Sequence, residues 1–318
     1  MARGKHNHSD FFFIFVRCFL KPFIADTRQM KYMIVVNTIN RSINLVERCL
    51  DSCLLQKVKP VQVVLIDQNE KLLVLKNEIK TNPVFLHSKT TAKAVSAARN
   101  SLIIPTGVEW IFFCDDDGYP SPGYSEELQK IIEDNPSIEM IAGKIIREDT
   151  NTAYTIRQNK FNSLKKFRYT KNLMGSNFVI KADVFNKLGR FDENFGAGSY
   201  WGSSEETDLC WKAFFANVNM EYFPQLAVYH VPPFQESVKK GFLKAFKYGI
   251  GKGALVYKWL FKKKKIIVMY ELLEMMIVPF IQMLRGIIVL KFQLIPNSFA
   301  TISGRLFGLL KAFFAGRF

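Results

Sequence analysis

The sequence predicts an α/β fold, in which helices cover both faces of a parallel sheet. Apolar segments rich in β-branched residues, typical of buried parallel strands, alternate with segments whose apolar residues recur at helical spacing. Polar residues follow three of these strands where each strand ends, which is where open α/β sheets bind ligands. The chain of 318 residues is long enough to bury a large core.

The predicted elements follow one another in a regular order. In the first half they are a strand at 33–38, a helix at 43–56, a strand at 61–67, a short helix at 94–103, a strand at 110–115 and a helix at 121–135. The last of these helices is expected to have a capped N-terminus with acidic residues in its first turn. In the second half they are a strand at 176–181, helices at 182–189 and 205–217, and an extended segment at 220–230.

Candidate ligand-binding side chains lie at the ends of three predicted strands. Thr38, Asn40 and Arg41 end or follow the first strand, Asp67 ends the second, and Asp115–Asp117 end the third. Because these strand ends meet at one edge of the sheet, we expect a single site there. Adjacent carboxylates repel one another, and a divalent cation beside a nucleotide diphosphate would offset that repulsion. The alternative for the aspartates is a turn or helix-cap cluster.

The order of short motifs resembles that of the family 2 glycosyltransferases. The motifs are VVNTINR, VVLIDQNE, AARN, CDDDGYPSP, GSNFVIKADVFNKLGRFDENFG, GSSEETDLCWKAF and VYH. The combination of GRFDE and EETDL downstream of the aspartates is the most specific part, and the resemblance covers about 31–255. It implies a GT-A fold, with a Rossmann-like mixed sheet, and transfer of a sugar from a nucleotide-diphosphate donor to an acceptor hydroxyl.

The resemblance also implies a role for each candidate donor residue. Thr38, Asn40 and Arg41 would line the nucleotide pocket, Asp67 would accept a hydrogen bond from the base, Arg99 would face the diphosphate, and Asp115 or Asp116 would hold the ribose. The role of Asp67 favours uracil and hence a UDP-sugar. Asp117 would hold Mn²⁺ or Mg²⁺, and His230 would make a further metal or diphosphate contact; alternatively, His230 satisfies local hydrogen bonds.

The resemblance places the catalytic base at Glu206, which follows Glu205. Many relatives have Glu-Asp at this position, so Glu206 carries one more methylene group than their aspartate. Either carboxylate can take a proton from an acceptor hydroxyl, and the implied displacement inverts the anomeric configuration. The alternative, which is compatible with catalysis, is that both glutamates favour the positive end of the following helix.

The loop 195–206 is predicted to form part of the acceptor site. It is rich in small residues, and Tyr200 and Trp201 offer aromatic rings that stack on sugars. For Trp201 the alternative is ordinary packing.

Basic residues concentrate near the C-terminus. From Lys239 onwards there are 15 Lys and Arg against 2 Glu, so this segment holds +13 of the net charge of +16. Lys, Phe and Leu alternate there, glycines at 249, 251 and 253 are expected to break the helix, and Glu271, Glu274, Gln282 and Arg285 form a narrow polar stripe. We expect amphipathic helices that bind an anionic membrane surface, and no nucleic acid. The alternative is a helical hairpin packed on the catalytic domain or on another subunit.

Three parts of the chain are therefore predicted. They are an apolar and basic extension at 1–30, a GT-A catalytic domain at 31–233 and a basic amphipathic helical tail at 234–318. No segment is predicted to span a membrane, and five scattered cysteines favour a reducing compartment. We expect the protein at the cytoplasmic face of the cell membrane, with a glycan or lipid-linked acceptor. The alternative functions are a sugar nucleotidyltransferase and a non-catalytic relative that binds nucleotide-sugars or organises a membrane complex.

Overall fold

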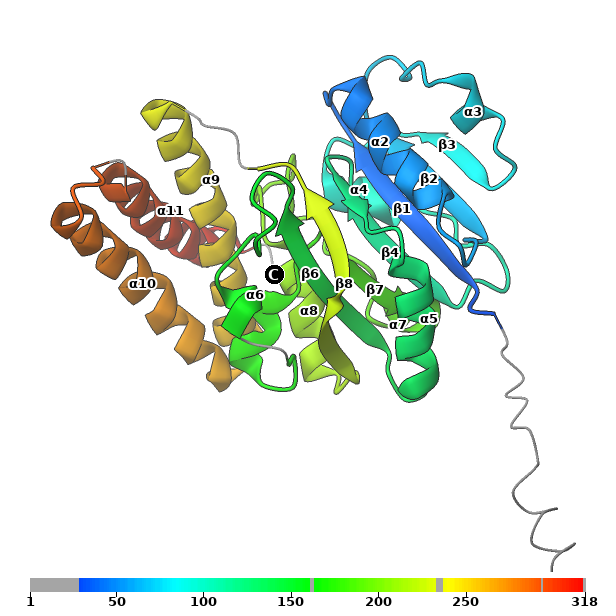
Figure 1. Cartoon of the computed structure of the whole chain (residues 1–318). Coiled ribbons are helices and arrows are strands. Elements are labelled where there is room, and N and C mark those ends of the chain that lie inside the picture. The colour runs from blue at the N-terminus through cyan, green and yellow to red at the C-terminus, as the bar shows by residue number, and fades with distance from the viewer. Residues whose placement is uncertain (1–28, 161–162, 233–236, 293, 317–318) are drawn as a thin grey trace, which may run out of the picture.

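The structure, a computed structural model, describes residues 29–160, 163–232, 237–292 and 294–316. Its centre is a mixed sheet of eight strands in the order β3-β2-β1-β4-β7-β6-β8-β5 (Figure 1). The strands are β1 (Tyr32–Thr38), β2 (Gln62–Asp67), β3 (Phe85–Lys89), β4 (Trp110–Asp115), β5 (Gly118–Pro120), β6 (Met140–Arg147), β7 (Phe178–Lys181) and β8 (Met220–His230). The predicted extension lies outside the described residues, apart from its last two positions.

Helices flank the sheet and follow it. They are α2 (Ile43–Leu54), α3 (Asn77–Lys80), α4 (Val95–Asn100), α5 (Tyr124–Asp134), α6 (Arg157–Lys160), the 3₁₀-helix η1 (Phe167–Asn172), α7 (Ala182–Lys187), α8 (Glu205–Phe215), α9 (Val238–Tyr257), the π-helix η2 (Lys258–Lys262), the 3₁₀-helix η3 (Ile266–Val268), α10 (Met269–Ile288) and α11 (Leu294–Ala315). Two predictions were wrong in detail. α4 ends at Asn100 and not at 103, and a turn follows at Ser101. α5 has no side-chain cap, because Gly123 stands at the cap position.

The central strand β1 is buried on both faces, as the continuous apolar run predicts. Tyr32, Ile34 and Val36 pack in the core cluster that contains residues of α2 and α5. Met33 and Val35 pack in the cluster on the other face, with residues of α4, α7 and α8. Successive side chains of a strand point to opposite faces, so the run supplies two separate cores.

The pairing of β5 with β8 brings distant segments together at one end of the sheet. β1 to β4 are parallel, whereas β7 runs antiparallel to β4 and β6, and β5 runs antiparallel to β8. Gly118 pairs with His230, and the amide of Val231 donates to the carbonyl oxygen of Asp117 at 3.2 Å. The end of β8 therefore lies beside the acidic turn that follows β4.

The C-terminal helices pack on the sheet-containing part of the chain through a third core cluster. Figure 1 shows α9, α10 and α11 side by side at the end of the sheet away from β3. Trp211 of α8, Trp259 of η2 and Met275 of α10 belong to this cluster. Lys258 donates to Asp192 at 2.8 Å and to Asp208 at 2.7 Å, in the GRFDE and EETDL motifs respectively. Packing on the domain, the alternative left open by the sequence, is thus present in the structure.

The glycines expected to break the segment after 238 do not break it, since α9 runs through all three. A Cβ atom at Gly253 would collide with the carbonyl oxygen of Arg305, and one at Gly308 would collide with that of Ile250. A Cβ atom at Gly251 would collide with Ser203, in the loop before α8. The missing side chains let α9 approach α11 and the catalytic domain closely, in the way that small residues permit between apolar helices.

One helix in the described part of the chain, Ile266–Ile288, is long and apolar enough to cross a membrane, judged by length and composition alone. The sequence predicted no such segment, because charged residues interrupt the apolar run. The structure turns two of them inward. Glu271 is buried and accepts a hydrogen bond from Lys252 at 2.7 Å, and Glu274 pairs with Lys171.

Candidate active site

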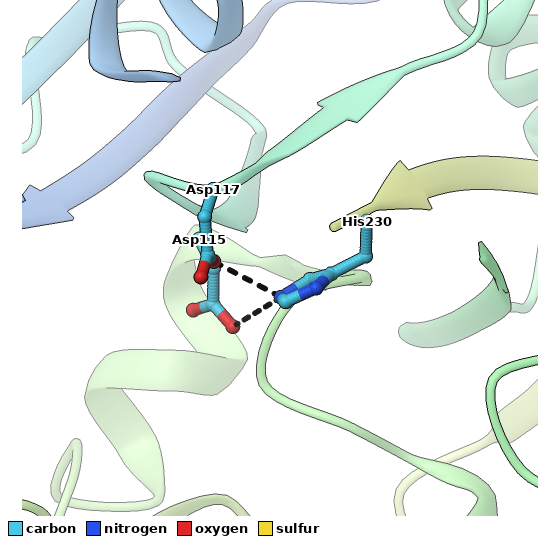
Figure 2. A group of neighbouring side chains, drawn as sticks. All are labelled: Asp115, Asp117 and His230. Atoms are coloured by element: carbon cyan, nitrogen blue, oxygen red, sulfur yellow. Dashed lines mark ion pairs between the residues drawn. The ribbon is translucent and has the colours of Figure 1, made fainter. Parts of the chain in front are cut away.

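The acidic turn after β4 is surrounded by cationic side chains. Arg41 donates through Nε to Asp116 at 2.9 Å and lies 3.0 Å through Nη1 from Asp117. The Nε2 atom of His230 lies 3.0 Å from Asp117 and 3.9 Å from Asp115 (Figure 2). These contacts offset the repulsion among the three carboxylates. For this reason a buried strand can end in such a cluster.

These contacts and burial together determine the charge state of the cluster. Burial raises the pKa of Asp116 to about 6, against the opposing charge of Arg41. Burial also acts to raise the pKa of Asp117, but the hydrogen bond and charge of His230 outweigh it, so the pKa is lowered. Burial acts to lower the pKa of His230, whereas the bond to Asp117 raises it to about 9. In this structure the two residues therefore form an ion pair.

Asp115, Asp117 and His230 fit a divalent cation. One ligand atom from each residue lies within 4.8 Å of the others. The Nδ1 atom of His230 lies 2.9 Å from the carbonyl oxygen of Val231, which can only accept, so Nδ1 carries a proton and Nε2 faces the carboxylates. This is the orientation in which a metal-ligating histidine is held by its other nitrogen. A cation there would replace the positive charge of the imidazolium.

Arg99 lies between the acidic turn and the glutamates of α8. It is only 3 % exposed, and its Nη2 donates to Asp115 at 3.1 Å. Its Nη1 is buried and has no hydrogen-bond partner among the described residues. The charge of Arg99 also acts to lower the pKa of Glu205 and of Glu206. The guanidinium therefore faces both acidic groups and keeps an N–H available for an anionic ligand.

Glu205 and Glu206 begin α8 after Ser204, which has a positive φ of 78°. Burial raises the pKa of both carboxyl groups, and the charge of Glu205 raises that of Glu206 further. Two neighbouring acids of this kind share protons, so Glu206 is held nearer to neutrality than an exposed glutamate. A Cβ atom at Gly175 would collide with the Glu206 side chain, so Gly175 leaves room for it.

Three of the predicted nucleotide residues lie around the end of β1, and the fourth does not offer a free oxygen. Thr38 is buried and Asn40 is exposed, with Arg41 between Asn40 and the acidic turn. Asp67 is fully buried. Its oxygens accept from the backbone and side-chain nitrogens of Asn69, from the amide of Leu73 and from the ring of His87, at 2.7–3.0 Å. In this structure Asp67 therefore holds the loop after β2, and its contact with a base stays a prediction.

The predicted acceptor aromatics differ in their exposure. Trp201 is 1 % exposed and belongs to the third core cluster, which is the ordinary packing that the sequence left open as the alternative to an acceptor platform. Tyr200 is 40 % exposed, and the Nζ atom of Lys311 in α11 lies 3.9 Å from the centre of its ring. Burial of the larger ring stabilises the loop by removing apolar surface from water, and sequence alone did not distinguish the two rings.

A cavity of about 850 Å³ opens beside the glutamates and extends beneath the C-terminal helices. Its lining includes Glu206, Gly175 and Tyr248, together with Lys252 and Arg305. Gly175 opens one of the motifs that resemble the family, whereas Tyr248, Lys252 and Arg305 were not predicted, because nothing in their local pattern separates them from ordinary surface or helix positions. The only indication was the polar stripe of α10, of which Glu271, Glu274 and Gln282 line the cavity.

Comparisons with known proteins agree with this architecture. The family model described as "Glycosyl transferase family 2" matches residues 33–189. "Uncharacterized glycosyltransferase YwdF" of Bacillus subtilis (strain 168) is 25 % identical over 177 residues, which are 54 % of this chain and 65 % of that protein. An "Uncharacterized glycosyltransferase" of Haemophilus influenzae (strain ATCC 51907 / DSM 11121 / KW20 / Rd) is 25 % identical over 161 residues, 49 % of this chain and 54 % of that protein. The chain thus covers less than two thirds of the length of either relative.

A solved structure supports the fold. The crystal structure of S. aureus TarS matches with a TM-score of 0.53 and 14 % identity, covering 73 % of this chain and 40 % of that one. This likeness concerns the fold alone. The predicted GT-A-like mixed sheet with C-terminal helices is confirmed.

Proposed function

We propose that the protein is a metal-dependent, inverting glycosyltransferase, and the match of residues 33–189 to the model of glycosyl transferase family 2 supports this proposal. It moves a sugar from a nucleotide-diphosphate donor to a hydroxyl group of an acceptor. The observation that carries the proposal is the position of Arg99, which bonds Asp115 on one side and whose charge reaches Glu205 and Glu206 on the other. A cation site and a candidate base thus lie around one guanidinium, as a displacement at a sugar diphosphate needs.

In the proposed reaction the acceptor hydroxyl gives its proton to Glu206 and its oxygen attacks the anomeric carbon. The new carbon–oxygen bond forms on the face opposite the diphosphate, and the bond to the diphosphate oxygen breaks with its electron pair. Arg99 and Arg41 stabilise the negative charge on the departing group, since each guanidinium donates in a planar fork. Asp115, Asp117 and His230 would hold Mn²⁺ or Mg²⁺, which supplies further stabilisation of that charge when bound.

The base of the donor nucleotide is open within this proposal. The family resemblance favours UDP, but Asp67 lends it no support because its oxygens are already bonded. A donor screen should therefore compare UDP-, GDP-, dTDP- and CMP-sugars.

We also propose that the protein works at the cytoplasmic face of the membrane, on a glycan or lipid-linked acceptor. The outer surface of the C-terminal helices supports this. Its exposed apolar side chains include Leu273, Ile277, Phe280, Ile281, Leu284 and Ile288 of α10 and Leu306, Phe307, Leu310, Phe313 and Phe314 of α11. Many exposed apolar side chains on neighbouring helices are typical of an interaction surface, and the exposed lysines at 262–264 would attract anionic lipid.

A panel of nucleotide-sugars tests the proposal. The full chain is screened by thermal stabilisation and by donor hydrolysis, with and without Mn²⁺. We expect one donor to stabilise the protein in a metal-dependent way, and we expect Asp117→Asn to remove the metal dependence. Asp134→Asn, an exposed aspartate at the end of α5, is the control and should behave as wild type. Absence of metal-dependent stabilisation by any donor would contradict the proposal.

A further inference from the structure

The cavity beside Glu206 is lined by both acidic and basic side chains. Glu205 and Glu206 line it where α8 begins. The other charged residues of its lining are four cations and two carboxylates: Arg157, Lys171, Lys252, Arg305, Glu271 and Glu274. Apart from Glu205 and Glu206, the lining therefore has more positive than negative side chains.

Two of the four cations are already paired. Lys252 donates to Glu271 at 2.7 Å, while Lys171 binds Glu274 and lies 3.5 Å from Glu271. The two carboxylates are therefore occupied by the two lysines. The arginines form no ion pair in the described part of the chain.

Arg305 in particular has an unfilled hydrogen-bonding group. Its Nη1 donates to the carbonyl oxygen of Met275, but its Nε is buried and has no partner among the described residues. Burial lowers the pKa of Arg305 to about 10; the charges of Glu271 and Glu274 act against this shift, and the charge of Arg157 adds to it. Leaving a buried N–H of a cation unpaired is costly, and a ligand that accepts from it would remove this cost.

We propose that Arg305 and Arg157 bind a phosphate group carried by the acceptor, while the acceptor hydroxyl lies at Glu206. This rests on the proposed function and names its acceptor class. A guanidinium is the side chain best suited to the planar, two-point recognition of phosphate. The volume of the cavity is within the range of sites that take small molecules. Apolar side chains of Ile156, Met275 and Val278 line the same cavity and would contact the uncharged part of the acceptor.

Binding measured in the absence of donor tests this inference independently of transfer. The probes are farnesyl phosphate and glycerol 3-phosphate, with farnesol and glycerol as their neutral counterparts, titrated into the full chain in detergent by calorimetry. The variants are Arg305→Gln and Arg157→Gln. The matched control is Arg285→Gln, an exposed arginine of α10 that does not line the cavity. Because Arg157 is exposed, its variant remains informative if Arg305→Gln fails to fold.

We expect at least one phosphate probe to bind more tightly than its alcohol. In either variant the dissociation constant of that probe should rise about tenfold, which is the loss expected for one charge-assisted hydrogen bond. In the control it should not change. Binding of farnesyl phosphate alone would indicate a lipid-linked acceptor, and binding of glycerol 3-phosphate as well would indicate a phosphate on the glycan. Equal binding of phosphate and alcohol, or unchanged phosphate binding in both variants, overturns the inference. Metal-dependent donor binding stays intact in either case, so the two proposals fail separately.

Discussion

Glu206 is a carboxyl group whose surroundings favour its protonated form. Burial and the neighbouring charge of Glu205 both raise its pKa, and Arg99 opposes them only in part. A base must be deprotonated to accept a proton, so this residue gains activity as pH rises through its pKa. A base with a raised pKa is also a better proton acceptor once it is ionised.

We therefore predict an acidic limb in the pH profile of kcat that lies well above the pKa of an exposed glutamate. Below that limb the rate should fall about tenfold per pH unit, because only the ionised fraction of Glu206 reacts. Glu205→Gln should move the limb to lower pH, since it removes the charge that raises the pKa of Glu206. The measurement is kcat against pH at saturating Mn²⁺ and donor. A limb near pH 4.5, or a limb that does not move in Glu205→Gln, would contradict this role.

A second prediction for a single residue concerns the contribution of Lys258 to stability. It is buried and bonds both Asp192 and Asp208, so Lys258→Met leaves Asp192 without its cation and Asp208 with only Lys212, at 3.9 Å. Breaking a buried ion pair by removing one partner costs about 3–5 kcal/mol of unfolding free energy. We expect a large drop in the thermal midpoint of the full chain. Lys187→Met, which breaks the exposed pair with Asp183, should change it little; equal effects of the two substitutions would refute the structural role of Lys258.

Some site residues could be predicted from the sequence and others could not, for a physical reason. Residues tied to a strand end, such as Asp115 and Asp117, could be found because the sheet fixes where they lie. Asp67 also ends a strand, yet local hydrogen bonds fill its oxygens, and Trp201 folds into the core. Such outcomes depend on neighbours that are distant in sequence or on loop geometry. Arg305 could not have been found, because only the packing of α11 brings it to the cavity.

At the scale of helices and strands, the strongest patterns were the most informative. The continuous apolar runs predicted β1, β2 and β4 within one residue of their bounds. The antiparallel pairing of β5 with β8 was not predictable, because three residues carry too little pattern to fix a partner. The prediction that the glycines of α9 break the helix was wrong, since their low helix propensity is outweighed by close packing against α11.

The α9–α11 contact gives a prediction with a definite sign. On propensity alone, Gly→Ala inside a helix stabilises by about 1 kcal/mol. At Gly253 the added methyl group would collide with the backbone of Arg305, whereas at Gly241 it meets only the Asn297 side chain at 3.2 Å. We expect Gly253→Ala to lower the thermal midpoint and Gly241→Ala to leave it unchanged or raise it. A rise in both variants would mean that the two helices are not in close contact.

At the scale of the whole molecule, one helical unit carries both candidate membrane contacts. These are the apolar outer face of α10 and α11 and the lysines at 262–265, and the same unit covers the acceptor cavity. We predict that the full chain floats with vesicles containing phosphatidylglycerol. Replacing the lysines at 262–265 by glutamine should weaken this binding at least about tenfold, since each lysine near an anionic surface contributes about 1 kcal/mol. The control replaces the exposed lysines 57, 71, 80 and 130. Equal loss in both variants would indicate a general charge effect, and no flotation of wild type would refute membrane attachment.

The same arrangement connects the proposed membrane-binding helices to the proposed catalytic residues. α9 touches the loop before the catalytic glutamates through Gly251 and Ser203, and Lys258 bonds the motifs on either side of that loop. The C-terminal helices are therefore part of the site, and a chain cut after β8 should lose the acceptor cavity.

The central claim is that Glu206 acts as the base and that other residues of the same cleft bind the donor. The direct measurement is the single-turnover transfer rate of Glu206→Gln at saturating donor, with the donor dissociation constant measured in parallel and Glu127→Gln, in the first turn of α5, as control. We predict donor affinity within about twofold of wild type and a transfer rate lower by about 100-fold or more, the contribution typical of a general base. Transfer at the wild-type rate in Glu206→Gln would contradict the account.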